Sequence, residues 1–503
     1  VTDVEYGYDG KIYVSDFVSG WKTHQAGRIY TLNKKDSGTD ATIINVQKLV
    51  THDFDQMADA KLTGLLAHAD MRIRLRAQFA LANKSNPPLF VSAFKQSKTL
   101  LPKLHAVWGL GMIARQNNDA GKEATAELIS MAMQDYDGEI KAQISRCLGE
   151  AQLIEKRGSA LMHLLRDASP RVQAYAAISL GKIKHTPAFP SLLKLIEKNA
   201  NQDAHLRHAC VMGLLGTATI KQLVELKNHQ SDAVQMAALL TLRRHRSPEI
   251  VQFLTASSRS VSLEGIRAIN DLPIKSVRHA VADILPRYAQ ASGKVAEFTP
   301  MMQRRLVHSA FRVGGDKNIR ALLAYIDSSN TTVDPAQRSE AVRLLGLWNT
   351  PPEIDQSVGR YDPLPKRDNK NVTQILQEEL PKLLIKGNPA TAELLALSSH
   401  YKLKLDDVPP ARLLEIARNT IHSSAARAEA LKYVVQNPPT DFAKELAELV
   451  KNKDPLLASA ALELSAEHAP GACTDLIYSA TRKSRPLLLR QTAWSMMIDT
   501  GSN

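Results

Sequence analysis

Two histidines have a spacing at which they can share a metal ion. His205 and His208 lie three positions apart, and Asp203 comes just before them. On a helix this spacing places both imidazoles on one face, where they can bind one ion together. The sequence offers no evident third ligand, and polar side chains in helical repeats commonly bond to the neighbouring repeat. The pair is therefore a candidate metal site with a structural alternative beside it.

His105 and Trp108 form a second pair that has a chemical and a structural interpretation. His105 is a candidate axial ligand for a haem docked against the chain. The alternative is that both side chains pack between neighbouring repeats, which is the commoner situation for such residues. Asp16 and Trp21 are also open to two interpretations, since they either line a pocket of a β-structure or stabilise a turn.

Four arginines lie near the start of a predicted second helix of a repeat, and we interpret them as candidate partner-binding residues. The second helices of a solenoid line its concave face, where a guanidinium group meets an acidic partner. In the alternative interpretation, such an arginine bridges to an aspartate of the adjacent turn, for example Asp70 or Asp167, and forms an internal ladder. The four residues are Arg74, Arg171, Arg207 and Arg278.

Catalytic motifs with a fixed local geometry are absent from this sequence. It has no GxxxxGK[ST] phosphate loop, no HExxH zinc helix, no GxSxG nucleophile elbow and no GxGxxG after a strand. Cys147, Cys210 and Cys473 stand alone, without a CxxC or CxxCH pair, and each is expected to pack as a small buried thiol. We therefore assign no catalytic residue and no cofactor to the chain, with an enzyme built from scattered residues as the alternative.

Composition favours an elongated helical repeat protein. The 503 residues exceed the roughly 250 to 300 that one compact core holds. With 44% hydrophobic but only 5% aromatic residues, the chain suits closely packed helices rich in Ala and Leu. No apolar run approaches the roughly 18 residues of a membrane span. The net charge of +13 is spread singly along the predicted helices, which favours acidic protein surfaces over nucleic acid as partners.

A helical pattern recurs through most of the chain. In the clearest unit, between Ala160 and Ala200, Pro170 suits the first turn of a helix and Gly181 its end. Each unit is a helix pair that covers its apolar face only by stacking on its neighbours. Equivalent leucines recur about every 28 to 38 residues, at Leu81, Leu110, Leu148, Leu180, Leu214 and Leu242.

This pattern predicts a mostly α fold, a right-handed α-solenoid of HEAT-like helical pairs over residues 43–349. Residues 350–371, rich in Pro and charge, predict an extended loop, and further helical repeats are expected over residues 372–503.

Residues 1–36 have a different pattern. Two alternating runs flank Asp9-Gly10, which is typical of a hairpin, and Gly27 to Leu32 predicts a third strand. Three such strands make most of one β-propeller blade, which cannot bury its two faces alone. The sequence begins at Val1 without an initiator Met or a leader, so we interpret it as a processed product or a fragment.

The opening segment resembles the closing blade of sorbosone/glucose-dehydrogenase-like propellers. Several helical segments are similar to the HEAT region of large secreted proteins of planctomycetes and verrucomicrobia, in which a dehydrogenase-like propeller precedes HEAT repeats and a c-type cytochrome often follows. The residues that carry the likeness are Val1–Val4, Asp9-Gly10, Tyr13–Asp16, Gly20-Trp21, Gly27–Tyr30, Leu104–Gly111, Leu206–Ala209, Leu263–Ile274, Glu340-Ala341, Leu345–Trp348, Gly359, Asp362–Pro365 and Arg367-Asp368.

That resemblance implies an exported, periplasmic protein that accompanies a redox system. Because most of the propeller and any CxxCH are missing here, haem c is expected only in a partner or in a segment outside these residues. We therefore predict a non-catalytic scaffold that binds or spaces propeller and cytochrome-like modules. The alternatives are a part of a quinone- or haem-linked sugar or alcohol dehydrogenase whose catalytic parts lie elsewhere and, more weakly, a basic solenoid that binds nucleic acid.

Overall fold

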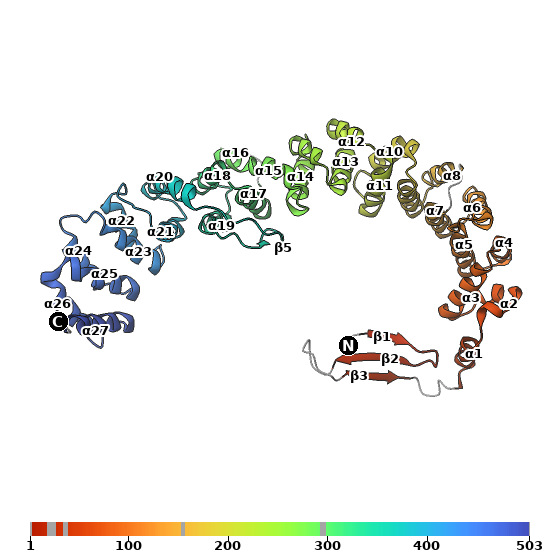
Figure 1. The fold of residues 1–503 in the computed structure, drawn as a ribbon, viewed down its shortest axis with the longest axis horizontal. Helices are drawn as coiled ribbons and strands as arrows, with labels where there is room; N and C mark the ends of the chain where they lie inside the picture. Colours follow the sequence, from red (N-terminus) through yellow and green to blue (C-terminus); the bar gives the residue numbers. More distant parts are fainter. Residues whose placement is uncertain (1–2, 18–26, 34–38, 152–155, 292–297, 502–503) are drawn as a thin grey trace. The chain divides into compact units, whose positions relative to one another are not determined.

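The protein folds as a HEAT-like solenoid of helices that follows a small N-terminal sheet in the chain, as the sequence predicts (Figure 1). The computed structural model describes residues 3–17, 27–33, 39–151, 156–291 and 298–501. Those residues form 27 α-helices, several short 3-10 helices and five strands. The chain divides into two compact units, unit 1 (Val1–His245) and unit 2 (Arg246–Asn503).

Unit 1 begins with an antiparallel sheet in the order β1 (Asp3–Tyr6), β2 (Ile12–Phe17), β3 (Gly27–Leu32). Gly10 has a φ of +76° in the turn between β1 and β2, a conformation that glycine adopts without strain. Two cross-strand rows of apolar side chains share one face of the sheet, namely Val4, Val14 and Tyr30, and Tyr6, Ile12 and Leu32. Trp21 lies outside the described residues.

Helix pairs fill the rest of unit 1 after α1 (Ala41–Val50). The first helices of the pairs are α2 (Asp59–Leu65), α4 (Pro87–Gln96), α6 (Asp119–Ala132), α8 (Arg157–Leu164), α10 (Phe189–Asn199) and α12 (Ile220–Glu225). The second helices are α3 (Met71–Asn83), α5 (Leu100–Ala114), α7 (Gly138–Glu150), α9 (Pro170–Lys182), α11 (Ala204–Thr217) and α13 (Asp232–His245). Each second helix packs directly against the next, which makes one continuous row (Figure 1).

Glycine sets the closest contact in that row. Gly181 lies inside α9, one residue before the helix ends at Lys182, and is not among the glycines with positive φ. A Cβ atom on Gly181 would collide with the carbonyl oxygen of Met212 in α11, and one on Gly216 would collide with the carbonyl oxygen of Gly181. The role expected for Gly181, a left-handed helix end, is therefore wrong, because this glycine instead allows two helix backbones to touch.

Unit 2 continues the same architecture from η5 (Pro248–Thr255). One set of stacked helices comprises α14 (Arg259–Asp271), α15 (Arg278–Ala282), α17 (Pro300–Val313), α19 (Pro335–Gly346), α21 (Thr391–His400), α23 (Ser424–Val434), α25 (Pro455–His468) and α27 (Leu487–Gly501). The other helices are α16 (Ile284–Gln290), α18 (Asp316–Ile326), α20 (Lys370–Lys386), α22 (Pro410–Arg418), α24 (Phe442–Leu449) and α26 (Pro470–Ala480). Within the described residues, no helix combines the length and the apolar character that crossing a membrane requires.

The segment between α19 and α20, predicted as an extended loop, contains a small hairpin. Strands β4 (Ile354–Asp355) and β5 (Arg360–Tyr361) pair antiparallel, and Gly359 precedes β5 with a φ of +69°. This hairpin packs against the helices of unit 2, and three of its polar residues are buried there, namely Asp355, Ser357 and Asp362.

Candidate functional site

His105 lies in the interior of unit 1, between α3 and α5, and is 2% exposed. Its Nδ1 donates to Oε1 of Gln78 at 2.8 Å, since that oxygen can only accept, and its Nε2 accepts from Nε of Arg74 at 3.1 Å. Burial, together with the charge of Arg74, lowers the pKa of His105 to about 4. The imidazole is therefore neutral at pH 7, and both of its nitrogens are engaged within the chain.

Hydrogen bonds between successive second helices continue from this histidine. Trp108 packs edge-on against His105 with ring centroids 5.0 Å apart, and its Nε1 donates to Oε1 of Gln143 at 2.9 Å. Gln143 donates to Oε1 of Glu139 at 2.8 Å, and Arg171 donates from Nε to the other carboxylate oxygen at 2.5 Å. We call this chain of contacts through α3, α5, α7 and α9 the polar ladder.

The four arginines singled out in the sequence have different surroundings. Arg74 is 8% exposed and donates to the backbone carbonyls of His68 and Ala69, and Arg278 is 5% exposed in unit 2. Arg171 is exposed and pairs with Glu139. Arg207 is half-buried, without an ion pair to any described residue.

The bridges expected for Arg74 and Arg171 are made by other cations. Arg72 pairs with Asp70 at 2.6 Å, and Lys141 pairs with Asp167 at 2.7 Å. Internal charge bridges to these aspartates thus exist, but one uses a cation two positions from Arg74 and the other a cation of the preceding repeat.

His205 and His208 are both exposed on α11. Asp203 caps this helix, and its carboxylate accepts from the backbone amides of His205 and Leu206 at 2.8 and 3.1 Å. Across the part of the chain that the structure describes, no group of three or more His, Cys, Asp or Glu residues could hold a metal ion. The metal site stays a prediction.

The three cysteines are free and buried, as predicted. Burial raises the pKa of Cys147 and of Cys210 to about 12, so neither thiol ionises at neutral pH.

A hollow of about 360 Å³ opens between α3, α5 and α7, beside the polar ladder. Its apolar lining comes from Phe79, Trp108 and Met112, and Phe79 is 47% exposed. Gly111 lets α5 approach α7 here, because a Cβ atom on it would lie 2.5 Å from Sγ of Cys147. We refer to this feature as the α5 hollow.

Charged residues line the rest of the α5 hollow. Glu150 accepts from Arg115 at 3.1 Å and from Lys182 at 3.0 Å. Burial acts to raise the pKa of Glu150, but Lys182, Arg115 and Arg146 outweigh it and lower that pKa below its ordinary value. Arg146 is exposed and makes no ion pair with any residue of the described ranges. Cations therefore outnumber the single carboxylate at this place.

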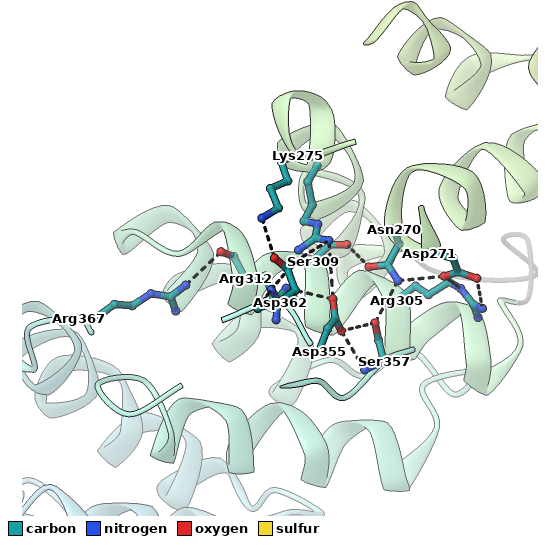
Figure 2. A network of polar contacts seen from close by, with 11 residues as sticks. Asn270, Asp271, Lys275, Arg305, Ser309, Arg312, Asp355, Ser357, Asp362 and Arg367 are labelled. Atoms are coloured by element: carbon teal, nitrogen blue, oxygen red, sulfur yellow. Dashed lines mark hydrogen bonds and ion pairs between the residues drawn. The ribbon is translucent and has the colours of Figure 1, made fainter. Parts of the chain in front are cut away.

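Unit 2 contains a buried charge cluster around the β4–β5 hairpin (Figure 2). Arg312 of α17 reaches Asp355 at 3.1 Å and Asp362 at 2.7 Å, and Lys275 pairs with Asp362 at 2.6 Å. Arg278 lies 3.7 Å from Asp355 and 4.0 Å from Asp362. Burial acts to raise the pKa of Asp362, yet the cations around it hold that pKa below its ordinary value.

Neutral polar groups extend the cluster along α14 and α17. Asn270 donates to Oγ of Ser357 at 3.1 Å and accepts from Oγ of Ser309 at 3.2 Å (Figure 2). On the other side, Arg367 donates to the carbonyl oxygen of Arg312, and its guanidinium lies 4.6 Å from the ring centroid of Trp348. Burial and the charge of Arg312 lower the pKa of Arg367 to about 10.

Sequence patterns indicate few members of the buried charge cluster and of the neutral polar groups beside it. The sequence predicts Arg278 as a partner-binding residue, and the segment with Gly359 and Asp362 as an extended loop that carries part of the family resemblance.

Comparison with known proteins supports the repeat fold. The family model described as a PBS lyase HEAT-like repeat matches residues 172–198, which include most of α9 and most of α10. A search of curated protein sequences finds no significant match.

Similar solved structures share low sequence identity with this chain. The complex of CpcE and CpcF of phycocyanin lyase from Nostoc sp. PCC7120 is 18% identical, covering 52% of this chain and 87% of that one, with a TM-score of 0.26. An engineered protein is 19% identical, covering 76% and 99%, with a TM-score of 0.25. Kap121p bound to Ste12p is 11% identical, covering 90% and 55%, with a TM-score of 0.47. By its helix pairs and its matched repeat, this chain is a HEAT-like repeat protein.

Proposed function

We propose that this chain is a protein-binding scaffold, and that a partner docks on the second helices of unit 1. The observation that carries this proposal is the α5 hollow, where Phe79, Trp108 and Met112 lie beside Arg115 and Arg146. Aromatic residues, Met and Arg are the residue types enriched in protein interfaces and in their energetic hot spots. The same types gather here on three consecutive second helices.

Rigidity of this face supports the same function. The polar ladder fixes Trp108 through Gln143, and the direct stacking of α5, α7 and α9 leaves little room for their rearrangement. A surface that is already ordered loses less conformational entropy on binding, so more of the contact energy remains as affinity. Spacing and docking of partner modules need this property, and neither needs a bond to be made or broken.

A photo-reactive amino acid at position 79 tests this proposal in the source organism. We expect crosslinks to a defined partner protein, and we expect the purified partner to bind the full chain but not its Phe79→Ala variant. The matched control is the same amino acid at Met133, which is 54% exposed just after the first helix α6. Crosslinks that form equally from both positions would contradict docking on the second helices.

We further propose that the partners are a dehydrogenase-like propeller and a c-type haem module of an exported, periplasmic redox system. The sequence resemblance supports this identity, as does the sheet of unit 1. Val4, Tyr6, Tyr30 and Leu32 share one face of that sheet and are between 46% and 64% exposed. Such a face is covered when another sheet stacks on it about 10 Å away, as neighbouring blades do.

An absorption spectrum of the natively purified complex, oxidised and then reduced with dithionite, tests the redox partnership. A Soret band with a sharp reduced α band is expected from a haem-carrying partner, and a spectrum with only the protein band near 280 nm would overturn it. Turnover of a sugar or an alcohol by the isolated chain would favour the alternative in which this chain itself helps to form an active site.

A further inference from the structure

We propose that the α5 hollow binds an acidic segment of the partner protein. One apolar side chain of that segment enters the hollow between Phe79 and Met112, and a neighbouring Asp or Glu pairs with Arg146. This inference rests on the proposed scaffold function and specifies the chemistry of its partner.

Charge is distributed unequally between the two rows of helices in unit 1. The six first helices from α2 to α12 carry seven Lys or Arg and six Asp or Glu, so they are almost neutral. The six second helices from α3 to α13 carry eleven Lys or Arg, and their only acidic residues are Glu139, Glu150 and Asp232. The eleven are Arg72, Arg74, Arg76, Lys103, Lys141, Arg146, Arg171, Lys182, Arg207, Arg243 and Arg244, of which all but Arg74 reach the surface.

A row of this charge attracts acidic partners. Its field raises the rate of encounter with an acidic protein and disfavours basic ones. The face that presents the apolar hollow is thus the face that selects a negative segment.

Charges at the hollow itself provide a specific binding point. Glu150 already forms ion pairs with Arg115 and Lys182, whereas Arg146 makes no ion pair with any described residue. An exposed guanidinium presents its donors in a planar fork that fits a carboxylate with two hydrogen bonds. An incoming Asp or Glu would satisfy Arg146 without displacing Glu150.

The apolar part of the hollow fits a side chain better than a nucleobase. Its volume of about 360 Å³ is at the lower end of ligand pockets, which suits one or two side chains of a peptide. Sites for single-stranded nucleic acid stack successive bases on several aromatic side chains, but Phe79 is the one well-exposed aromatic residue of this hollow, because Trp108 is half-buried, edge-on to His105 and bonded through its N–H to Gln143. We therefore argue for an acidic protein segment, and nucleic acid becomes an outcome of the test.

Selection from a random twelve-residue peptide library on the full-length chain tests this inference. Peptides that also bind a Phe79→Ala/Arg146→Glu double variant are removed by counter-selection. Both side chains are largely exposed, so both substitutions should leave the fold intact, which circular dichroism checks. The remaining peptides are expected to share an apolar residue flanked by Asp or Glu.

Binding of one selected peptide, measured by fluorescence anisotropy, gives the quantitative result. Arg146→Glu and Phe79→Ala are each expected to weaken binding about tenfold or more, as interface hot spots do. Lys122→Glu is the matched control, since Lys122 is exposed on the first helix α6. The affinity of this variant for the peptide should equal that of the natural protein. A peptide in which Asn and Gln replace Asp and Glu should bind the natural protein about as weakly as the original peptide binds the Arg146→Glu variant.

Different failures have different meanings. If neutral apolar peptides are selected and Phe79→Ala abolishes their binding, the acidic partner is wrong but the scaffold face survives. If the binding of no peptide depends on Phe79 or Arg146, the acidic-segment inference is wrong. If crosslinks from position 79 also fail to form, the proposed function is wrong as well. Oligothymidylate is the probe for nucleic-acid binding. If it displaces the peptide at 150 mM salt, and its affinity falls steeply as salt rises, the hollow binds nucleic acid and this inference is wrong.

Discussion

Arg312 donates from Nη2 to Oδ2 of Asp362 at 2.7 Å, although the two residues are 50 positions apart in the chain. The side chains of Arg312 and of its second partner, Asp355, are only 2% and 1% exposed. Removing ions from water costs several kcal/mol each, so a buried ion is tolerated only beside its partner. The β4–β5 hairpin is therefore held to α17 by charges that neither side can lose alone.

Asp362→Ala should strongly destabilise unit 2. The substitution leaves Arg312 and Lys275 without their common carboxylate, and Arg312 is too buried to recover its hydration. Losing one partner of a buried pair costs about 3 to 5 kcal/mol. Urea denaturation measures the loss, and hydrogen exchange of the hairpin amides should accelerate in the same variant.

Glu378→Ala is the matched control for this experiment. Glu378 pairs with Arg320 at 3.1 Å, but the two side chains are 45% and 50% exposed. Such surface pairs contribute less than about 1 kcal/mol. Equal losses in the two variants would show that burial does not set the strength of the hairpin contact.

The fold could be predicted from the sequence because helix pairs leave a local, periodic pattern. Pro170 marks the start of α9, and the equivalent leucines lie in second helices whose apolar faces repeat along the chain. The hairpin contacts of unit 2 could not be predicted in this way. They join Asn270 to Ser357 and Lys275 to Asp362, residues 87 positions apart, and no periodicity connects such residues.

Of the residues that carry the proposed function, the sequence pattern indicated only Trp108, and for another role. Spacing indicated cations near the starts of second helices, but it could not show that Arg72 would take Asp70 while Arg74 turned inward to His105. This choice depends on the rotation of α3 against α5, which only packing decides. The sequence does not indicate Phe79 and Met112 as binding residues, because an apolar residue in a helix usually belongs to the core.

Glu340→Gln should reduce the dependence of unit 2 stability on acidic pH. Burial acts to raise the pKa of Glu340, but Arg343 and His308 outweigh it and lower this pKa from 4.5 to about 2. The folded protein thus holds this carboxylate ionised at a pH where the unfolded chain would protonate it. Its contribution is full above pH 4.5 and is lost as pH falls towards 2.

Solvent screening reduces the contribution of Glu340 to about 1 to 2 kcal/mol. Urea midpoints measured between pH 2 and 7 should show this loss in the natural protein and a flatter profile in Glu340→Gln. Parallel profiles for the two proteins would assign the acid sensitivity to other carboxylates.

His105→Gln should remove a pH dependence of unit 1 that lies in a higher range. The pKa of His105 is about 4 in the folded protein, against an ordinary value of 6.5, so the unfolded chain binds a proton first as the pH falls. The stability contributed by this residue is therefore full above pH 6.5 and decreases by about 1 to 2 kcal/mol towards pH 4.

A glutamine can keep the hydrogen bonds of His105 to Gln78 and Arg74 but cannot titrate, so its profile should be flat over this range. Chemical denaturation between pH 4 and 7 makes the comparison, and the imidazole signals of His105 in NMR spectra should show no titration above pH 5. A titration of these signals near pH 6.5 would mean that the ring is open to solvent.

Gly181→Ala and Gly64→Ala should change stability in opposite directions. A methyl group on Gly181 collides with the backbone of α11 at Met212 and Gly213, so α9 and α11 must move apart. Overpacking of this kind costs about 1 to 3 kcal/mol. Gly64 lies in α2, and no atom lies within 4 Å of the place that an alanine methyl group would take, so alanine there gains about 0.5 to 1 kcal/mol of helix propensity. Thermal unfolding of both variants compares the two effects, and a neutral Gly181→Ala would mean that backbone contact does not fix the spacing of α9 and α11.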